Sequence, residues 1–251
     1  MEHIKHILSY TRKAVDDYRM IRPGDKIAVG VSAGKDSLTL LCSLAALKRF
    51  YPNSFELEAI TIDMGFKGGS DYSGIEALCK ELEVSYRVVP SDIAEIVFDI
   101  RKEPNPCSLC AKLRRGALNS AAKEAGCNTV ALGHHFDDVV DTFMLNLFFE
   151  GRIGCFRPVT YLSRMDVRVI RPLIYTPEKE IRAFAKERDL PVVESLCPAN
   201  GNTQRENMKQ LLSTYERQHK GLRHRIFGAI QRGHVDGFHL PGEEIPEEEE
   251  I

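Results

Sequence analysis

Apolar positions along this chain follow two periods, one typical of buried strands and one typical of amphipathic helices. Residues 1–22 have apolar side chains spaced for one face of a helix, and Pro23-Gly24-Asp25 ends that helix. Short apolar runs then alternate with helical segments. The predicted strands are Ile27–Ser32, Glu56–Asp63, Ser85–Val89, Thr129–Gly133 and Val167–Leu173, with a further strand-like run at Pro191–Val193. The predicted helices are one from Asp36 and those at Ser73–Leu82, Leu109–Ala125, Asp137–Phe149 and Pro177–Arg188.

This alternation predicts an α/β fold, with a parallel, Rossmann-like sheet and helices on both of its faces. Residues 204–233 are helical throughout and basic, which indicates a small C-terminal appendage. We expect an N-terminal helix at 1–22, a catalytic domain at 23–198, a basic helical appendage at 199–235 and an acidic tail at 236–251. Six glutamates between residues 243 and 251 predict that this tail is disordered.

The composition fits an ordinary globular protein, with 43% hydrophobic and 28% charged residues. No run of apolar residues is long enough to cross a membrane, and the first residues are too polar for a signal peptide, so we expect a cytoplasmic location. Seven cysteines, an odd number, argue against a closed disulfide framework. Cys42, Cys79, Cys127 and Cys155 each stand alone and are interpreted as small buried hydrophobes.

The most specific motif joins the first predicted strand to the helix after it. It is Val31-Ser32-Ala33-Gly34-Lys35-Asp36-Ser37. A turn of small residues from a strand into a helix directs free N–H groups and the positive end of a helix dipole at one point, where phosphate is the expected ligand. The spacing of a Walker A loop is absent. The motif resembles the SGGxDS loop of the PP-loop ATP pyrophosphatases, which hold the β- and γ-phosphates of ATP and cleave between the α- and β-phosphates. The resemblance implies that this loop binds ATP and that Lys35 acts in catalysis.

One residue of this loop departs from the family pattern. The second position is glycine in the family and Ala33 here. If the backbone at this position has a positive φ, the methyl group costs about 1 kcal/mol or more.

Two further motifs lie at the carboxyl ends of predicted strands, where ligands bind in open α/β sheets. In relatives of this fold the end of the second strand holds the adenine and ribose, so the resemblance implies that role for Ile62, Asp63 and Met64. Taken alone, Asp63 is equally well a strand-ending cap. At the other strand end, Gly133, His134 and His135 are assigned to ATP, with the histidines as candidate contacts of the α-phosphate.

Two adjacent carboxylates follow these histidines. Asp137 and Asp138 are suited to cap the next helix, which is the structural interpretation of one of them. Beside a phosphate loop, such carboxylates also bind Mg²⁺ or position a nucleophile. We favour the functional role for Asp137 and take Asp36 as a second candidate ligand of Mg²⁺.

Three cysteines stand apart from the others. Cys107 and Cys110 lie at the start of a predicted helix, and Cys197 lies in a later loop. The helix dipole and the nearby Arg114 are expected to lower the pKa of the first two thiols. The CxxC spacing is compatible with zinc, a redox dithiol, an iron–sulfur cluster or chance, and zinc would need a fourth ligand such as His134.

Four segments in matching order resemble the tRNA 2-thiocytidine synthetase family, and the resemblance covers residues 1–235. They are residues 107–118, 132–138, 171–175 and Cys197-Pro198. The resemblance implies that Cys107, Cys110 and Cys197 hold a 4Fe–4S cluster with one iron free of protein ligands, and that Arg114 faces it. It also implies an enzyme that adenylates the C2 oxygen of a cytidine in the anticodon loop and replaces that oxygen with sulfur. The alternatives are a uridine acceptor, a small-molecule acceptor, or a nucleotide-binding redox or metal sensor.

The net charge of −2 hides a basic C-terminal third. Residues 151–232 contain 16 Lys or Arg against 8 Asp or Glu. This imbalance predicts a surface for the phosphates of tRNA, whereas a solvated helix face usually mixes both signs. The candidates are Arg205, Lys209, Arg217, Lys220, Arg223 and Arg225. The other expected partners are a sulfur donor, which is a cysteine desulfurase or sulfide, and a second copy of the chain in a homodimer.

Overall fold

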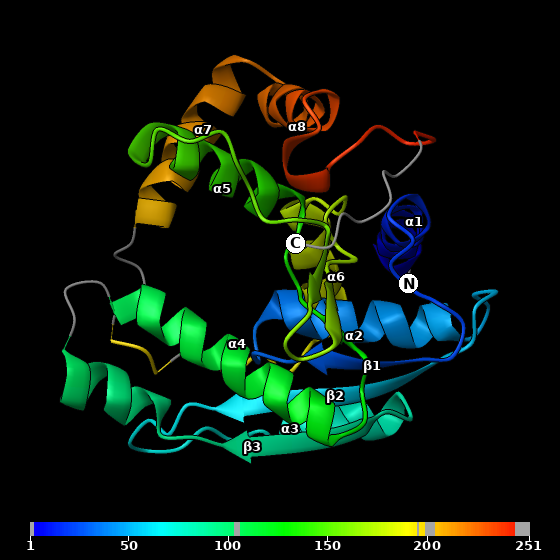
Figure 1. The fold of residues 1–251 in the computed structure, drawn as a ribbon, viewed down its shortest axis with the longest axis vertical. Coiled ribbons are helices and arrows are strands. Elements are labelled where there is room, and N and C mark those ends of the chain that lie inside the picture. Colours follow the sequence, from blue (N-terminus) through cyan, green and yellow to red (C-terminus); the bar gives the residue numbers. More distant parts are fainter. Residues whose placement is uncertain (1–2, 103–105, 195, 199–203, 244–251) are drawn as a thin grey trace.

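The computed structural model describes residues 3–102, 106–194, 196–198 and 204–243 of the chain (Figure 1). The start of the predicted basic appendage, residues 199–203, and the end of the predicted acidic tail, residues 244–251, lie outside these ranges. Among the described residues, no helix combines the length and the apolar character needed to cross a membrane.

A six-stranded sheet forms the centre of the fold, with strand order β3-β2-β1-β4-β6-β5. The neighbours from β3 to β6 pair in parallel, and β5 is antiparallel to β6. Central β1 buries Ile27, Ala28 and Val29 completely, as a strand covered on both faces should. The predicted α/β fold with a parallel sheet is thus confirmed, with one antiparallel edge strand added. The strands are β1 Asp25–Gly30, β2 Phe55–Asp63, β3 Ser85–Pro90, β4 Thr129–Ala131, β5 Val159–Leu162 and β6 Val167–Ile170.

Helices follow most of the predicted segments, and the predicted and observed boundaries differ by a few residues. The first helix ends at Asp17 instead of near Arg22. Residues between β3 and the next α-helix form one short π-helix, η1. The α-helices are α1 His3–Asp17, α2 Lys35–Lys48, α3 Ser73–Glu81, α4 Pro106–Glu124, α5 Phe136–Phe149, α6 Glu178–Glu187, α7 Gln204–Gln218 and α8 Leu222–Arg232. The short helices are η1 Glu95–Arg101 and the 3-10 helix η2 Val235–Gly237.

One expected strand is absent, and one observed strand was not expected. The run Pro191–Val193 is no strand; its one bond toward the sheet region is from the N–H of Val193 to the carbonyl oxygen of Ala33, at 3.0 Å. Strand β5 was not predicted, because its four residues are only partly buried or exposed and lack a continuous apolar run. An edge strand has one neighbour, so its sequence is under weaker constraint than that of β1.

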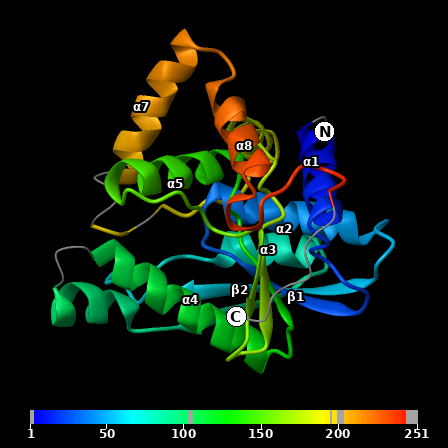
Figure 2. The ribbon, with the colours of Figure 1, turned by 45° about the horizontal axis from the view of Figure 1, so that its top comes forward.

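The two faces of the sheet are covered by different helices. Helix α4 packs Leu118, Ala121 and Ala122 against one face, beside Ala28 and Val130 of the strands. The other face carries the larger apolar cluster, to which α1, α2, α3 and α6 contribute. Figure 2 shows α4 and α2 on opposite sides of β1 and β2.

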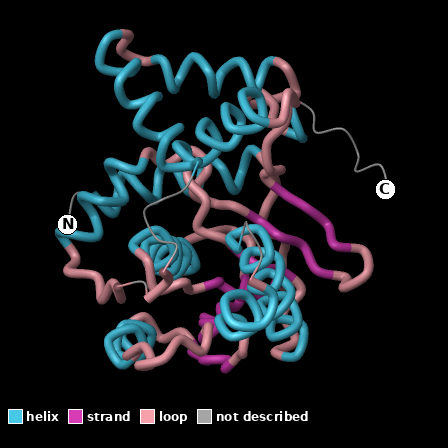
Figure 3. The backbone as a smooth tube through the Cα atoms, turned by 90° about the vertical axis from the view of Figure 1, so that its left-hand side faces the viewer, coloured by secondary structure: helices cyan, strands magenta, loops and turns pink. Residues whose placement is uncertain are grey.

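Helices α5, α7 and α8 form a layer that stands over one end of the sheet (Figures 2 and 3). Phe136 of α5 stacks on Phe227 of α8, with ring centroids 4.9 Å apart. Phe238, which follows α8, is fully buried and its ring meets that of Tyr18 at 6.0 Å. These residues belong to the same apolar cluster as α1 and α2, so the helical layer and the sheet share one core.

Candidate functional site

Hydrogen bonds of Ser32 and Ser37 connect the two ends of the loop between β1 and α2. The N–H of Ser32 donates to Oγ of Ser37 at 3.1 Å, and the Ser37 hydroxyl donates to the carbonyl oxygen of Gly34 at 3.0 Å. Gly34 is the N-cap residue of α2 and has no side chain that could accept from the first N–H groups of the helix. These N–H groups and the positive end of the helix dipole are therefore available to an anion.

Ala33 lies in the left-handed region of backbone conformation, with φ of 62°. Its side chain is buried, and its carbonyl oxygen accepts the N–H of Val193. A residue with a Cβ atom pays about 1–2 kcal/mol in this region relative to glycine. The condition that the sequence analysis attached to this position, a positive φ, is therefore met.

The loop follows β1, the strand at which the order of strands in the sheet reverses. From β1 the chain adds β2 and β3 on one side, whereas β4 lies on the other side of β1. Such a switch point leaves a crevice at the carboxyl ends of the two central strands. Gly133, just after β4, lies against the start of α2, because a Cβ atom there would come within 3.1 Å of backbone atoms of Asp36 and Ser37. Two of the predicted motifs thus meet at one edge of the sheet.

Lys35 is held between two carboxylates. Its Nζ lies 2.8 Å from Oδ1 of Asp36 and 3.1 Å from Oε1 of Glu178, the first residue of α6. Burial alone would lower the pKa of Lys35, but the two carboxylates raise it above its ordinary value. The ammonium group therefore keeps its charge at the mouth of the loop.

The two histidines after β4 have different environments. His135 is the N-cap of α5, where its Nδ1 accepts the N–H of Asp138 and its own N–H donates to the Asp138 carboxylate. Because Nδ1 accepts a hydrogen bond, the ring proton of the neutral imidazole is on Nε2. Nε2 lies 3.8 Å from Oδ1 of Asp36. Burial and the nearby Arg171 lower the pKa of His134 to about 4, so its imidazole is neutral. Nδ1 of His134 is buried, and no other described residue forms a hydrogen bond with it.

Asp137, the predicted catalytic or magnesium-binding carboxylate, has structural partners. Its Oδ2 accepts the N–H of Glu178 at 2.7 Å and so caps the start of α6, and its Oδ1 lies 3.3 Å from Arg223. Arg223 also donates to Asp141 at 2.7 Å. Asp36 pairs with Lys35, so neither candidate magnesium ligand presents a carboxylate without a partner. This geometry fits a helix cap better than a metal ligand at Asp137.

The end of β2 forms a tight turn. Oδ1 of Asp63 accepts the N–H of Gly65 at 3.1 Å, and its carbonyl oxygen accepts the hydroxyl of Ser91 at 2.6 Å. Both Ile62 and Met64 are partly exposed beside it. The turn lies at the same edge as the loop after β1, because β1 and β2 are parallel neighbours.

Cys107 and Cys197 both lie near enough to Cys110 to act on its charge. Burial raises the pKa of Cys110, and the thiols of Cys197 and Cys107 raise it further, against the lowering effect of Arg114. The expected fall in the pKa is therefore wrong for Cys110. Helix α4, whose first turns carry Cys107 and Cys110, begins on the side of the molecule toward which β2 and β3 point (Figure 1).

A single zinc ion is a poor fit to these thiols. Within the described part of the chain, no group of three or more His, Cys, Asp or Glu side chains is arranged to hold one metal ion. Ligands of an iron–sulfur cluster bind different iron atoms and need not converge on a point. The four other cysteines are unsuited to the role, because Cys42, Cys79 and Cys127 are buried, and burial raises the pKa of Cys155 to about 12.

The predicted basic surface divides into two sets of residues. Three of them pair with acids at the nucleotide edge: Arg205 with Asp138 at 3.3 Å, Lys209 with Glu178 at 2.9 Å, and the buried Arg223 with Asp137 and Asp141. The side chains of Arg217, Lys220 and Arg225 are exposed, around the end of α7 and the start of α8. Arg205 is also exposed, although it pairs with Asp138, whereas Lys209 is only partly exposed. We therefore take Arg217, Lys220 and Arg225, which are exposed and lie away from these acids, as the candidate phosphate-binding residues.

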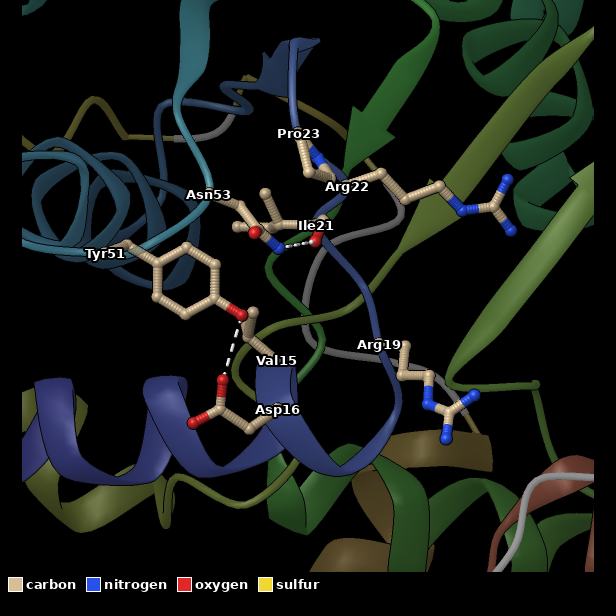
Figure 4. A pocket seen from close by; sticks show the side chains of 8 residues that line it. All are labelled: Val15, Asp16, Arg19, Ile21, Arg22, Pro23, Tyr51 and Asn53. Carbon is tan, nitrogen blue, oxygen red and sulfur yellow. Dashed lines mark hydrogen bonds between the residues drawn. The ribbon is translucent and has the colours of Figure 1, made fainter.

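A cavity of about 460 Å³ lies away from this edge, between the end of α1 and the loops that precede β1 and β2 (Figure 4). Its polar groups bond to one another. The Tyr51 hydroxyl donates to Asp16 at 2.9 Å, and the Asn53 amide donates to the carbonyl oxygen of Ile21 at 2.9 Å. We assign it no chemistry.

The sequence analysis missed Glu178. An acidic residue in the first turn of a helix is common, because it interacts favourably with the helix dipole, and so it does not by itself indicate a site. The structure brings it beside a lysine 143 positions earlier and a lysine 31 positions later, at 3.1 Å and 2.9 Å. A local sequence pattern cannot predict contacts between residues that are so far apart in the sequence.

Comparisons with known proteins agree with this geometry. A family model described as a PP-loop domain matches residues 4–214. The chain is 40% identical over 230 residues to a tRNA-cytidine(32) 2-sulfurtransferase of Geobacter sulfurreducens, covering 90% of this chain and 89% of that protein. It is 41% identical over 237 residues to the protein of that name from Geobacter metallireducens, covering 93% and 91%.

A solved structure is also similar. It is the U34-tRNA thiolase NcsA from Methanococcus maripaludis with its 4Fe–4S cluster, with a TM-score of 0.74 and 28% identity. The match covers 94% of this chain and 85% of the other. The resemblance inferred from the sequence is confirmed. The chain belongs to the PP-loop domain family and, within it, to the family of the tRNA-cytidine(32) 2-sulfurtransferases.

Proposed function

We propose that this protein is an ATP-dependent tRNA thiolase that replaces the C2 oxygen of an anticodon-loop cytidine with sulfur. The observation that carries this proposal is that an anion-binding loop follows β1 and that α4, which carries Cys107 and Cys110, begins on the side toward which the strands point, with Cys197 near enough to Cys110 to affect its charge. The names of the relatives agree with it. A nucleotide-binding sensor would need the loop and the cysteines, but it would not need an exposed basic surface.

The reaction divides into two displacements at this edge. The C2 oxygen of the base attacks the α-phosphorus of ATP, and pyrophosphate leaves. Sulfide then attacks C2, and AMP leaves with the former C2 oxygen. The N–H groups at the start of α2 and the ammonium of Lys35 bind the triphosphate and stabilise the leaving pyrophosphate. Mg²⁺ bound to the phosphates would offset more of this charge.

Other residues at the edge are assigned by position. The turn at Ile62, Asp63 and Met64 borders the space where adenine and ribose would lie. The buried Nδ1 of His134 has no hydrogen-bond partner among the residues that the structure describes, and it is our candidate contact for the α-phosphate. His135 acts indirectly, by capping α5 and facing Asp36.

Cys107, Cys110 and Cys197 fit a 4Fe–4S cluster. Cys107 is exposed, and Cys110 and Cys197 are partly exposed, so their thiols are accessible to an assembling cluster. When bound, a cluster held by three thiolates has one iron open to an outside ligand, and it thereby supplies the sulfur-transfer chemistry. Arg114 hydrogen-bonds to Cys110 and brings a positive charge to this site.

The tRNA would lie over the ends of α7 and α8, where Arg217, Lys220 and Arg225 are exposed. A tRNA substrate implies a cytoplasmic location. The sulfur donor we propose is a cysteine desulfurase or free sulfide, and a homodimer is the assembly we propose.

An anaerobic thiolation assay tests this function. The protein with reconstituted iron is mixed with unmodified tRNA, ATP and sulfide, and the nucleosides are analysed by mass spectrometry. We expect 2-thiocytidine, loss of the product in Cys197→Ala, and unchanged product in the matched Cys42→Ala variant. A second candidate acceptor is uridine, because the similar solved structure is a U34-tRNA thiolase. A product of 2-thiouridine alone would favour that acceptor, and the absence of any thionucleoside would contradict the proposal.

A further inference from the structure

Glu178 joins three elements of the fold through one carboxylate. Its Oε1 lies 3.1 Å from Nζ of Lys35 in the nucleotide loop and 2.9 Å from Arg182 on its own helix. Its Oε2 lies 2.9 Å from Nζ of Lys209 on α7. Three cations around one carboxylate are more than are needed to neutralise it, so this arrangement requires an explanation beyond charge balance.

The carboxylate is itself held in place. Only 10% of the Glu178 side chain is exposed, and its backbone N–H is bonded to Asp137. A buried, fixed acceptor restricts the lysines that bind to it. The Nζ of Lys35 lies 2.8 and 3.1 Å from the two oxygens of Asp36 and 3.1 Å from Oε1 of Glu178, so both carboxylates fix the position of its ammonium group.

We propose that Glu178 is a positioning residue for Lys35, and that Lys209 makes the position of Lys35 depend on helix α7. The second part rests on the proposed function, because α7 and the turn after it carry two of the exposed cations assigned to tRNA. Lys209 shares the negative charge of Glu178 with Lys35. When Lys209 is removed or displaced, Glu178 binds Lys35 more strongly and draws its ammonium group away from the phosphates. ATP binding and tRNA binding are coupled in this way.

The first test needs no tRNA. The affinity of a non-hydrolysable ATP analogue with Mg²⁺ is measured by calorimetry. Lys209→Met should weaken binding about tenfold, within the usual range of coupling between sites. Lys209→Arg, which keeps the charge, should bind within about twofold of the wild type. The matched control is Arg182→Met, which also removes a cation from Glu178. Its side chain is 59% exposed, so we expect less than about a threefold change.

A double-variant comparison separates a positioning role from a direct contact. If Lys209 acts through Glu178, then Lys209→Met should have no further effect in a Glu178→Gln background. An equal loss of affinity in both backgrounds would mean that Lys209 contacts the nucleotide itself and would overturn the proposal. An unchanged affinity in the single variant Lys209→Met would overturn it as well.

The second test adds unmodified tRNA at saturating concentration. We expect tRNA to change the affinity for the ATP analogue in the wild type and in Arg182→Met. The affinity of Lys209→Met for the analogue should be the same with and without tRNA. An equal change in all three proteins would overturn the link through α7. A wild-type protein that does not bind tRNA would contradict both this link and the proposed function, whereas the measurements without tRNA would still decide the role of Glu178.

Discussion

Replacing Ala33 with glycine tests whether the nucleotide loop holds the left-handed conformation that the structure gives it. At φ of 62°, the change should relieve about 1–2 kcal/mol of backbone strain. Two losses oppose this gain. The unfolded chain gains freedom worth about 0.4–1 kcal/mol, and the fold loses a buried methyl group worth about 0.8 kcal/mol. The net change in the free energy of unfolding should therefore stay within about 0.8 kcal/mol of zero.

A near-zero result is informative only beside a matched control, which Ala59 of β2 provides. Ala59 is also buried, but it has an ordinary strand conformation. The Ala59→Gly variant suffers the same two losses without the relief of strain, so it should be less stable than the wild type by about 1.2–1.8 kcal/mol. The difference between the two variants isolates the strain at Ala33.

Equilibrium unfolding in urea measures both changes, on proteins with the same iron content. We expect Ala33→Gly to be more stable than Ala59→Gly by about 1–2 kcal/mol, and its affinity for ATP to equal or exceed that of the wild type. Equal destabilisation of the two variants would refute the left-handed conformation at Ala33. Weaker ATP binding by Ala33→Gly would show that the methyl group contributes to the site.

Three further predictions concern charged groups. Arg168→Met removes one partner of the buried ion pair with Asp25 and should lower the free energy of unfolding by about 3–5 kcal/mol in chemical denaturation; a loss below about 1 kcal/mol would contradict this. Despite burial, which favours the neutral acid, Lys209, Arg182 and Lys35 lower the pKa of Glu178 to about 2. The stability that this ionised carboxylate contributes is present above its unfolded pKa of 4.5 and is lost as the pH falls toward 2, so thermal unfolding of Glu178→Gln should vary less with pH in that window. Reversing the charges of Arg217 and Lys220 should weaken tRNA binding and lower the log–log salt slope by about 0.7–0.9 per lost contact, with ATP affinity unchanged; the same slope in the variant would move the tRNA surface elsewhere.

Local patterns predicted the elements of this fold well, because the information needed is local. The continuous apolar run of β1 and the small residues before α2 are readable within a window of a dozen positions. The edge strand β5 was missed since partial burial on one side of a sheet leaves a weak pattern. The meeting of Gly133 with Asp36 was predictable only through the general rule for parallel sheets, which places strand ends at one edge.

The partners of the charged residues were much harder to predict. A two-to-one excess of basic residues indicated a nucleic-acid surface, but it did not distinguish exposed from paired cations. Arg223 is buried between two carboxylates, and Lys209 binds Glu178, so both contribute to the nucleotide edge. Such pairings depend on how α5, α7 and α8 pack. Packing between segments that are distant in the sequence produces no repeating pattern of residues from which it could be predicted.

The contact between Tyr18 and the segment after α8 has a consequence for the synthesis of this chain on the ribosome. The Tyr18 hydroxyl donates to the carbonyl oxygen of His239, and the two rings lie 4.5 Å apart although 221 positions separate them. Tyr18, which directly follows α1, therefore cannot complete its packing until the segment after α8 has been translated. Premature termination before Phe238 would leave the Tyr18 ring without these two aromatic partners, and such a chain would expose apolar surface that chaperones bind.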